Sequence, residues 1–168
     1  MNTHLIRAAG PVLLAMLALG AWAAPATAGV TTTFVQAQNY QDMPFSPIDR
    51  EQILKSLGEH FAKLGQALPP DQDLAIDVKD IDLAGRLVPN FRAGQDIRVL
   101  HGGADWPHMT LHYTLSSHGQ VLAAGDEQLS DMDYLNRIST YSDGDPLRFE
   151  KRMIDDWFKK KFLAARKG

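Results

Sequence analysis

The sequence predicts an α+β domain: a two-layer sandwich in which a mainly antiparallel sheet of about five strands carries two long helices and one short helix on one face. Apolar and polar residues alternate strictly over residues 108–115, which is typical of a strand with one buried face. A polar turn over residues 116–119 leads into a second apolar run, which indicates a hairpin. Two other segments carry apolar residues at helical spacing, and half-polar strands with hairpin connections favour helices on one face of the sheet.

Residues 1–28 are predicted to be a secretory signal peptide. Arg7 supplies a positive charge, an apolar run follows, and residues 26–28 have the small-x-small pattern of a cleavage site. The run is shorter than the roughly 20 apolar residues of a spanning helix, and no other segment of the sequence is long and apolar enough to span a membrane. We expect cleavage after Ala28, with Ala23 as a minor alternative, and a single exported domain over residues 29–168.

Composition narrows the classes of function. The chain has no cysteine, which excludes a lipid anchor on cysteine, disulfides, thiol chemistry and cysteine-built zinc sites. The formal net charge is −3, and it becomes −4 without Arg7, the one charged residue of the leader. A mildly acidic exported protein lacks the basic footprint of a nucleic-acid binder. We expect the periplasm as its location, with secretion beyond the outer membrane left open.

The first part of the mature chain predicts one strand and one long helix. Val30–Ala37 is rich in β-branched residues, as strands are. Ser46 can cap a helix, Pro47 suits its first position, and Asp49 is a capping-box partner. Gly65 marks its end. The apolar residues at helical spacing are Ile53, Leu54, Leu57, Phe61, Leu64 and Leu68.

The second strand covers residues 74–83. Its apolar residues alternate up to Val78 and then change phase, because Ile81 is one step out of register. A β-bulge near Lys79–Asp80 would bring both sets to the buried face.

The middle and end of the chain predict shorter elements. Residues 87–94 are predicted as a loop, and 97–99 as a short third strand. The hairpin follows, and residues 131–138 are predicted to form a short helix with its apolar side chains facing inward. Asp145 is the predicted cap of the last helix, with Pro146 at its first position. The apolar stripe of that helix comprises Phe149, Met153, Ile154, Trp157, Phe158 and Phe162.

Four motifs together suggest a family. They are Asp80-Ile81-Asp82-Leu83-Ala84-Gly85, then Asp105-Trp106-Pro107 leading into a strand with Tyr113, then Leu129-Ser130-Asp131-Met132-Asp133-Tyr134-Leu135, and finally Glu150-Lys151 followed by Asp156-Trp157-Phe158. The mature chain resembles, over essentially its whole length, a family of small exported Gram-negative proteins catalogued as domain of unknown function number 3016. The resemblance implies a single exported domain, and it brings no activity, cofactor, partner or catalytic residue with it.

A metal site is the alternative that the titratable residues leave open. The weak candidate ligands are Asp80, Asp82, His101, Asp105, His108 and His112. The α-carbons of His108 and His112 are expected roughly 13 Å apart on one strand, which is a poor spacing for one zinc ion. Asp80 and Asp82 are expected to point outward together, where a solvated edge is the favoured interpretation. A metal-assisted hydrolase would require these groups to converge on one pocket.

The leading hypothesis is a non-enzymatic binding or accessory module of the cell envelope. Its serines lie in no nucleophile-elbow pattern, and Gly102-Gly103 is too sparse for a phosphate cradle. We predict no catalytic residue and no cofactor, and an envelope protein or a small ligand as the partner. Trp106 and Pro107, which are core residues in the plainer interpretation, form the candidate binding surface. An exposed apolar patch or an open sheet edge would favour this hypothesis.

Overall fold

The structure is a computed structural model that describes residues 29–90 and 95–164. The predicted signal peptide, including the cleavage site after Ala28, lies outside the described residues. The described elements are β1 (Val30–Phe34), the short 3-10 helix η1 (Ala37–Asn39), α1 (Pro47–Gly65), β2 (Gln72–Asp82), β3 (Arg86–Asn90), β4 (Gln95–Val99), β5 (His108–Ser117), β6 (Gln120–Ser130), α2 (Arg148–Phe158) and the π-helical turn η2 (Lys159–Leu163).

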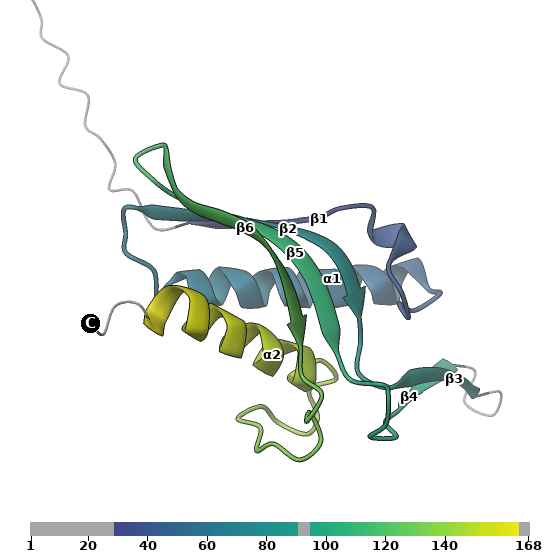
Figure 1. Cartoon of the computed structure of the whole chain (residues 1–168). Helices are drawn as coiled ribbons and strands as arrows, with labels where there is room; N and C mark the ends of the chain where they lie inside the picture. Colours follow the sequence, from purple (N-terminus) through teal and green to yellow (C-terminus); the bar gives the residue numbers. More distant parts are fainter. Residues whose placement is uncertain (1–28, 91–94, 165–168) are drawn as a thin grey trace, which may run out of the picture.

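The α+β class and the mainly antiparallel sheet are confirmed. Four strands form the main sheet in the order β1-β2-β5-β6, with β1 parallel to β2 and the other two pairings antiparallel. In Figure 1 the sheet is curved, and α1 and α2 both run along its same side. The β6 strand therefore forms one edge of the sheet, beside the C-terminal helix.

The predicted count of about five strands is wrong. The first four residues of the segment 87–94, which was predicted as a loop, belong to strand β3. This strand pairs with β4 in a separate two-stranded sheet. Figure 1 shows this small hairpin projecting from the end of the main sheet. Pro89 weakened the strand signal in the sequence, but proline is tolerated in a strand that lies at an edge.

The bulge in β2 is confirmed. The register between β2 and β5 shifts between Val78 and Asp80. Both Val78 and Ile81 are fully buried as a result. One extra residue therefore keeps two out-of-phase apolar runs on the same face of the sheet.

The α1 helix begins as predicted. The backbone N–H of Asp49 donates to the Ser46 hydroxyl oxygen at 3.3 Å, and Pro47 is the first helical residue. At its other end, Gly65 lies against β1: a Cβ atom added there would be 3.2 Å from the Val30 Cβ and nearer still to its Cγ2. The absence of a side chain at Gly65 allows α1 to lie directly on β1.

The last helix begins later than predicted, at Arg148. Leu147 occupies the cap position and makes no side-chain cap. Asp145 instead accepts the Leu147 N–H at 2.9 Å and binds the Lys151 ammonium at 2.7 Å, so it orders the turn before the helix. After Phe158 the helix continues as the π-helical turn η2.

The predicted short helix over residues 131–138 is wrong, because this segment forms turns. Its buried apolar side chain is Tyr134, whereas Met132, Leu135 and Ile138, which were expected to face inward, are exposed. Asp131 is buried beside the Arg152 guanidinium at 2.9 Å, and this pair holds the segment against α2. Long-range polar contacts thus outweigh the weak helical pattern.

The core is shared by the main sheet and both helices. Its fully buried side chains include Leu57 and Phe61 of α1, Ile76 of β2, Leu111 of β5 and Phe158 of α2. A smaller cluster of Ala84, Tyr134 and Phe149 lies beside it. Among residues 29–90 and 95–164, no helix is long and apolar enough to cross a membrane.

Candidate functional site

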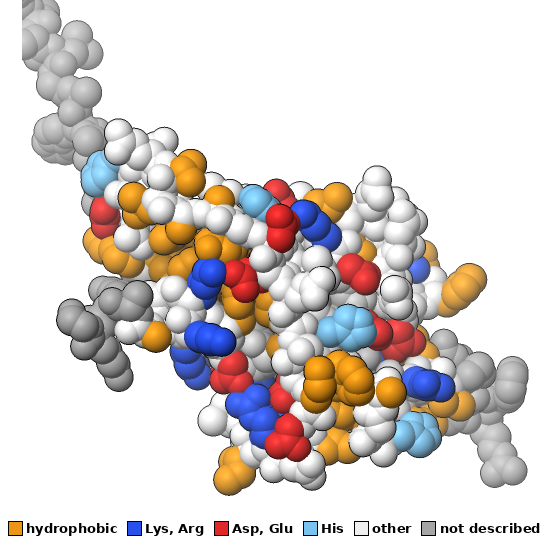
Figure 2. All heavy atoms as spheres, in the orientation of Figure 1, with side chains coloured by type: hydrophobic (Ala, Val, Ile, Leu, Met, Phe, Trp, Pro, Cys, Tyr) orange, Lys and Arg blue, Asp and Glu red, His pale blue; other side chains and the backbone are white. Residues whose placement is uncertain are grey.

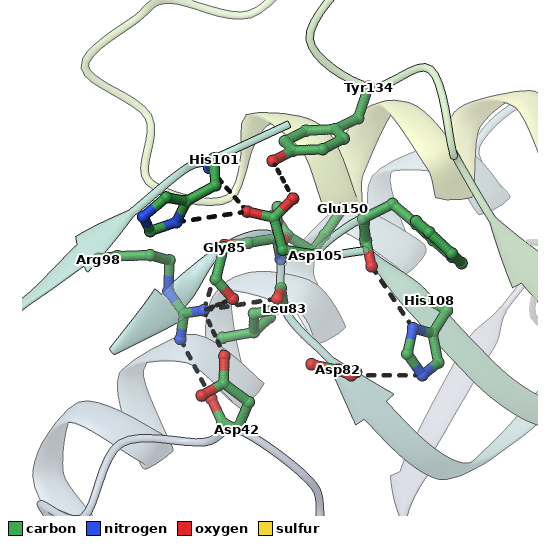
Figure 3. Close-up of polar contacts among 12 residues, drawn as sticks. Asp42, Asp82, Leu83, Gly85, Arg98, His101, Asp105, His108, Tyr134 and Glu150 are labelled. Atoms are coloured by element: carbon green, nitrogen blue, oxygen red, sulfur yellow. Dashed lines mark hydrogen bonds and ion pairs between the residues drawn. The ribbon is translucent and has the colours of Figure 1, made fainter. Parts of the chain in front are cut away.

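Four of the six predicted Asp and His candidates lie near one another, where β2 ends and β5 begins. Asp82 and His108 are direct partners across the β2–β5 pairing, and the His108 Nε2 lies 3.4 Å from the Asp82 carboxylate. The backbone N–H of His101 donates to Asp105 at 2.7 Å. Asp82, Asp105 and Asp42 line a common pocket of about 330 Å³, which we call the acidic pocket (Figure 3).

Asp105 is held by hydrogen bonds and serves as an anchor. Its second carboxylate oxygen accepts the Tyr134 hydroxyl proton at 2.9 Å, and its side chain is buried. Burial raises the pKa of this carboxyl, but hydrogen bonds from the backbone N–H of His101 and from Tyr134 outweigh it and hold the pKa below the usual range. At Asp82 burial prevails over the attraction of His108, and the pKa is raised.

The other two candidates, Asp80 and His112, do not line the acidic pocket. Asp80 accepts the backbone N–H of Gln41 at 3.3 Å. The His112 Nδ1 lies 3.1 Å from the Asp126 carboxylate, which also binds the Lys79 ammonium at 2.6 Å. In the part of the chain that the structure describes, no three His, Asp or Glu residues are placed to hold a metal ion together.

Arg98 neutralises part of the acidic pocket. Its guanidinium binds the Asp42 carboxylate at 2.8 Å and also donates to the carbonyl oxygens of Ala84, at 3.2 Å, and Leu83, at 3.5 Å (Figure 3). Because Arg98 belongs to β4, these bonds attach the β3–β4 hairpin to the end of β2. Much of the charge in this region therefore serves to hold the hairpin.

Sequence reasoning missed Glu150, whose side chain is 1 % exposed. One of its oxygens accepts the backbone N–H of Ala84 at 2.7 Å, and the other has no partner among the described residues. Burial raises the pKa of this carboxyl. Its position between Phe149 and Met153 in the apolar stripe was the signal that could have identified it.

The predicted surface of Trp106 and Pro107 lies largely inside the protein. Pro107 is buried and Trp106 is half-buried. Trp106 packs against the small cluster that contains Tyr134 and Phe149. These two residues therefore join the loop before β5 to the interior.

A groove of about 500 Å³ lies between the β6 edge and the C-terminal helix, and we call it the β6 groove. One wall is residues 127–131, the last residues of β6 and the residue after them. Side chains of consecutive strand residues point to opposite faces, so a hollow that all five line reaches the open backbone edge of the strand. The other side is lined by Arg137, Met153, Asp156, Trp157, Lys160 and Lys161.

The pairing of β5 with β6 shows which backbone groups face the groove. The Asp131 N–H donates to the Pro107 carbonyl oxygen at 3.2 Å, and the register is constant from there to Ala123. In an antiparallel pair, alternate residues direct their N–H and C=O groups to the partner strand. Those of Asp126, Gln128 and Ser130 therefore point to the open edge.

The β6 groove has an apolar floor and a charged rim. Leu129, Met153 and Trp157 supply apolar surface, and the Trp157 indole N–H is covered without an acceptor among the described residues. Figure 2 shows basic, acidic and apolar side chains interspersed where β6 and α2 face the viewer. Sequence reasoning predicted a strand after the turn over residues 116–119, but it did not predict that the last residues of this strand line a groove with the helix.

Most charges of the rim are paired with one another. At one end, Arg137 bridges Asp131, at 3.2 Å, and Asp156, at 2.5 Å. At the other end, Lys161 binds Glu127 at 2.6 Å, which raises the pKa of the lysine. These two groups of ion pairs contact the first and last of the β6 residues that line the groove, Glu127 and Asp131.

Comparison with known proteins identifies a family for this chain. No curated protein and no solved structure matches the chain. The family described as "Protein of unknown function (DUF3016)" matches residues 28–160, which include the acidic pocket and nearly all of the β6 groove. The match agrees with the resemblance carried by the four sequence motifs, and the chain belongs to this family.

Proposed function

We propose that this chain is an exported, non-enzymatic binding module of the cell envelope that takes up an extended polypeptide segment as an additional strand beside β6. The β6 groove carries this proposal, because it combines an open strand edge with a helix wall. Peptide recognition by strand addition uses this combination: backbone hydrogen bonds give affinity, and pockets for alternate side chains give specificity.

The dimensions and chemistry of the β6 groove support a ligand of this kind. Its volume of about 500 Å³ lies within the range of ligand sites, roughly 300–1,000 Å³. Three outward-facing residues of β6, from Asp126 to Ser130, offer backbone donors and acceptors to a strand of the same length. Leu129 and Trp157 supply apolar surface for the side chains that point toward the helix.

Other observations support the remaining parts of the proposal. The leader pattern supports export, and the resemblance carried by the four sequence motifs implies it. The titratable candidates support binding over catalysis, because Asp105 is committed to hydrogen bonds and His112 lies on a different part of the sheet. We therefore do not propose the metal-assisted hydrolase.

Replacing Gln128 by proline tests the proposal. Proline removes the backbone N–H that faces the open edge and leaves the β5–β6 hydrogen bonds intact, since those belong to the neighbouring residues. Peptides would first be selected for binding to residues 29–168 from a random display library. We expect Gln128→Pro to weaken their binding at least tenfold, measured by fluorescence anisotropy, and the matched variant Gln128→Ala to bind like the wild type.

Two results would overturn the proposal. One is unchanged binding by Gln128→Pro when circular dichroism and thermal unfolding show that the variant is folded. The other is the selection of no binding peptide by the folded wild-type protein. A peptide methylated on the backbone nitrogens that face β6 gives an independent check, because it should lose affinity without any change in the protein.

A further inference from the structure

We propose that the β6 groove selects an extended segment in which an apolar side chain and a carboxylate are two residues apart, with Lys160 as the residue that reads the carboxylate. This inference rests on the proposed function and names its substrate class. The carboxylate is an aspartate or glutamate side chain or the C-terminus of the segment.

The spacing follows from the two walls of the groove. In an added strand, a side chain opposite a β6 residue points to the same face as that residue. Leu129 is buried on the helix side, so the side chain opposite it points toward Met153 and Trp157. The side chain opposite Glu127 lies on the same face, two residues or roughly 6.8 Å away. There it meets the helix end that carries Lys160 and Lys161.

The choice of a carboxylate follows from the distribution of charge. Of the three cations that line the groove, Arg137 is bound to two acidic residues and Lys161 to Glu127. Lys160 lines the same groove, is exposed, and has no ion pair among the described residues. An incoming carboxylate can bind Lys160 without breaking an existing pair, whereas an incoming cation finds the groove's three acidic residues already paired.

The choice of an apolar side chain follows from the groove floor. Leu129 and Met153 are buried, and Trp157 is half-buried among aromatic rings that include Phe61 and Tyr113. A side chain placed between them removes apolar surface from water on both partners, which contributes roughly 25 cal/mol per Å². A polar side chain there would lose its hydration without gaining a partner.

The test uses fluorescein-labelled nine-residue peptides of serine and threonine that carry one leucine and one glutamate two positions apart. Both orders are included, because the strand can run in either direction. Matched peptides have glutamine in place of glutamate, and a third set ends at that position with a free or an amidated C-terminus. These sets distinguish an acidic side chain from a terminal carboxylate as the source of the charge.

The proteins compared are the wild type, Lys160→Gln, and Lys159→Gln as the control, since Lys159 is a neighbouring exposed lysine that does not line the β6 groove. We expect the wild type to prefer glutamate over glutamine by about fivefold at low salt, as for a partly exposed charge pair. The preference should disappear in Lys160→Gln and persist in Lys159→Gln.

Failure of this inference differs from failure of the proposed function. If the peptides bind the wild type, bind Gln128→Pro more weakly, and show no preference for glutamate, the proposed specificity is wrong while strand addition stands. If Lys159→Gln removes the preference as fully as Lys160→Gln does, the charge is read by the helix end as a whole, and the role of Lys160 is wrong. If the designed peptides do not bind while the library-selected peptides do and are weakened by Gln128→Pro, the specificity is wrong. If the selected peptides bind folded Gln128→Pro as tightly as the wild type, the proposed function fails.

Discussion

Glu150 joins α2 to the end of β2, and its raised pKa makes the stability of the protein depend on pH. It lies in the first turn of α2, where the helix dipole favours a negative charge, yet it is 1 % exposed and burial raises its pKa. The backbone N–H of Ala84 bonds one oxygen and partly opposes this effect. Burial is the larger influence, so the folded protein holds this proton more tightly than the unfolded chain does.

We predict that Glu150→Gln makes stability less dependent on pH. The contribution of the protonated carboxyl is full below the unfolded pKa of about 4.5 and is lost as pH rises through the higher folded pKa. Each unit between the two values corresponds to about 1.4 kcal/mol. Glutamine cannot ionise, so the free energy of unfolding of the variant, measured in urea from pH 4.5 to 8, should fall less than that of the wild type.

The exposed residue Glu51 provides the control for this experiment. Glu51→Gln should follow the wild-type pH profile. A Glu150→Gln profile parallel to the wild type would show that the buried carboxyl does not titrate differently in the folded and unfolded states.

Contacts of buried polar side chains with distant parts of the chain could not be predicted from the sequence. Glu150 and Ala84 are 66 positions apart, and Arg152 and Asp131 are 21 positions apart. Neither pair has a local pattern, because a hydrogen bond across the fold leaves no period in the sequence. The apolar stripes were readable, while the polar residues buried among them were not.

At the scale of elements, local signals were reliable where several agreed. The α1 helix had a cap, a proline at its first position and an apolar period, and the β5–β6 hairpin had strict alternation and a turn. Residues 131–138 had only a short apolar pattern, and the contacts of Asp131 and Tyr134 decided their structure instead. β3 contains Pro89, and because proline is rare in strands, the segment was predicted as a loop.

The contact between α1 and β1 gives a prediction at this scale. Gly65→Ala should lower the free energy of unfolding by about 1–3 kcal/mol, because the added methyl group collides with Val30. Gly58 is in the same helix, and a Cβ there would be an ordinary 3.7 Å from a ring carbon of Phe34. Gly58→Ala should therefore be neutral or stabilise by up to about 1 kcal/mol, since alanine favours helix more than glycine does.

Urea denaturation of the two variants measures this difference. Equal effects of the two substitutions would mean that the α1–β1 approach is not as close as described. The sign of the Gly58 result separates helix propensity from packing.

For the whole molecule, the β6 groove could not be predicted because its two walls are distant in the sequence. Local sequence patterns predict a strand at β6 and an amphipathic helix at α2, but they do not show which edge of the sheet the helix lies beside. That depends on the order β1-β2-β5-β6, which places β6 at the edge. The contact of Asp82 with His108 depends in the same way on which strands are neighbours.

Export gives a prediction for the complete chain. When the full sequence is produced in a Gram-negative host, the mass of the protein recovered from the periplasm should correspond to a chain that begins at Gly29, since cleavage is expected after Ala28. The same protein produced without residues 1–28 should stay in the cytoplasm and serves as the control. Recovery of the uncleaved chain from the cytoplasm would contradict export.

The strand order also sets the sequence of events during folding. β5 and β6 are joined by the two residues His118 and Gly119, both with positive φ. Because the loop is short, closing this hairpin costs little conformational entropy. β1 reaches its partner β2 only after the whole of α1 has been formed or bridged. We therefore expect the β5–β6 pairing to form before the β1–β2 pairing, so the N-terminal strand is the last to join the main sheet.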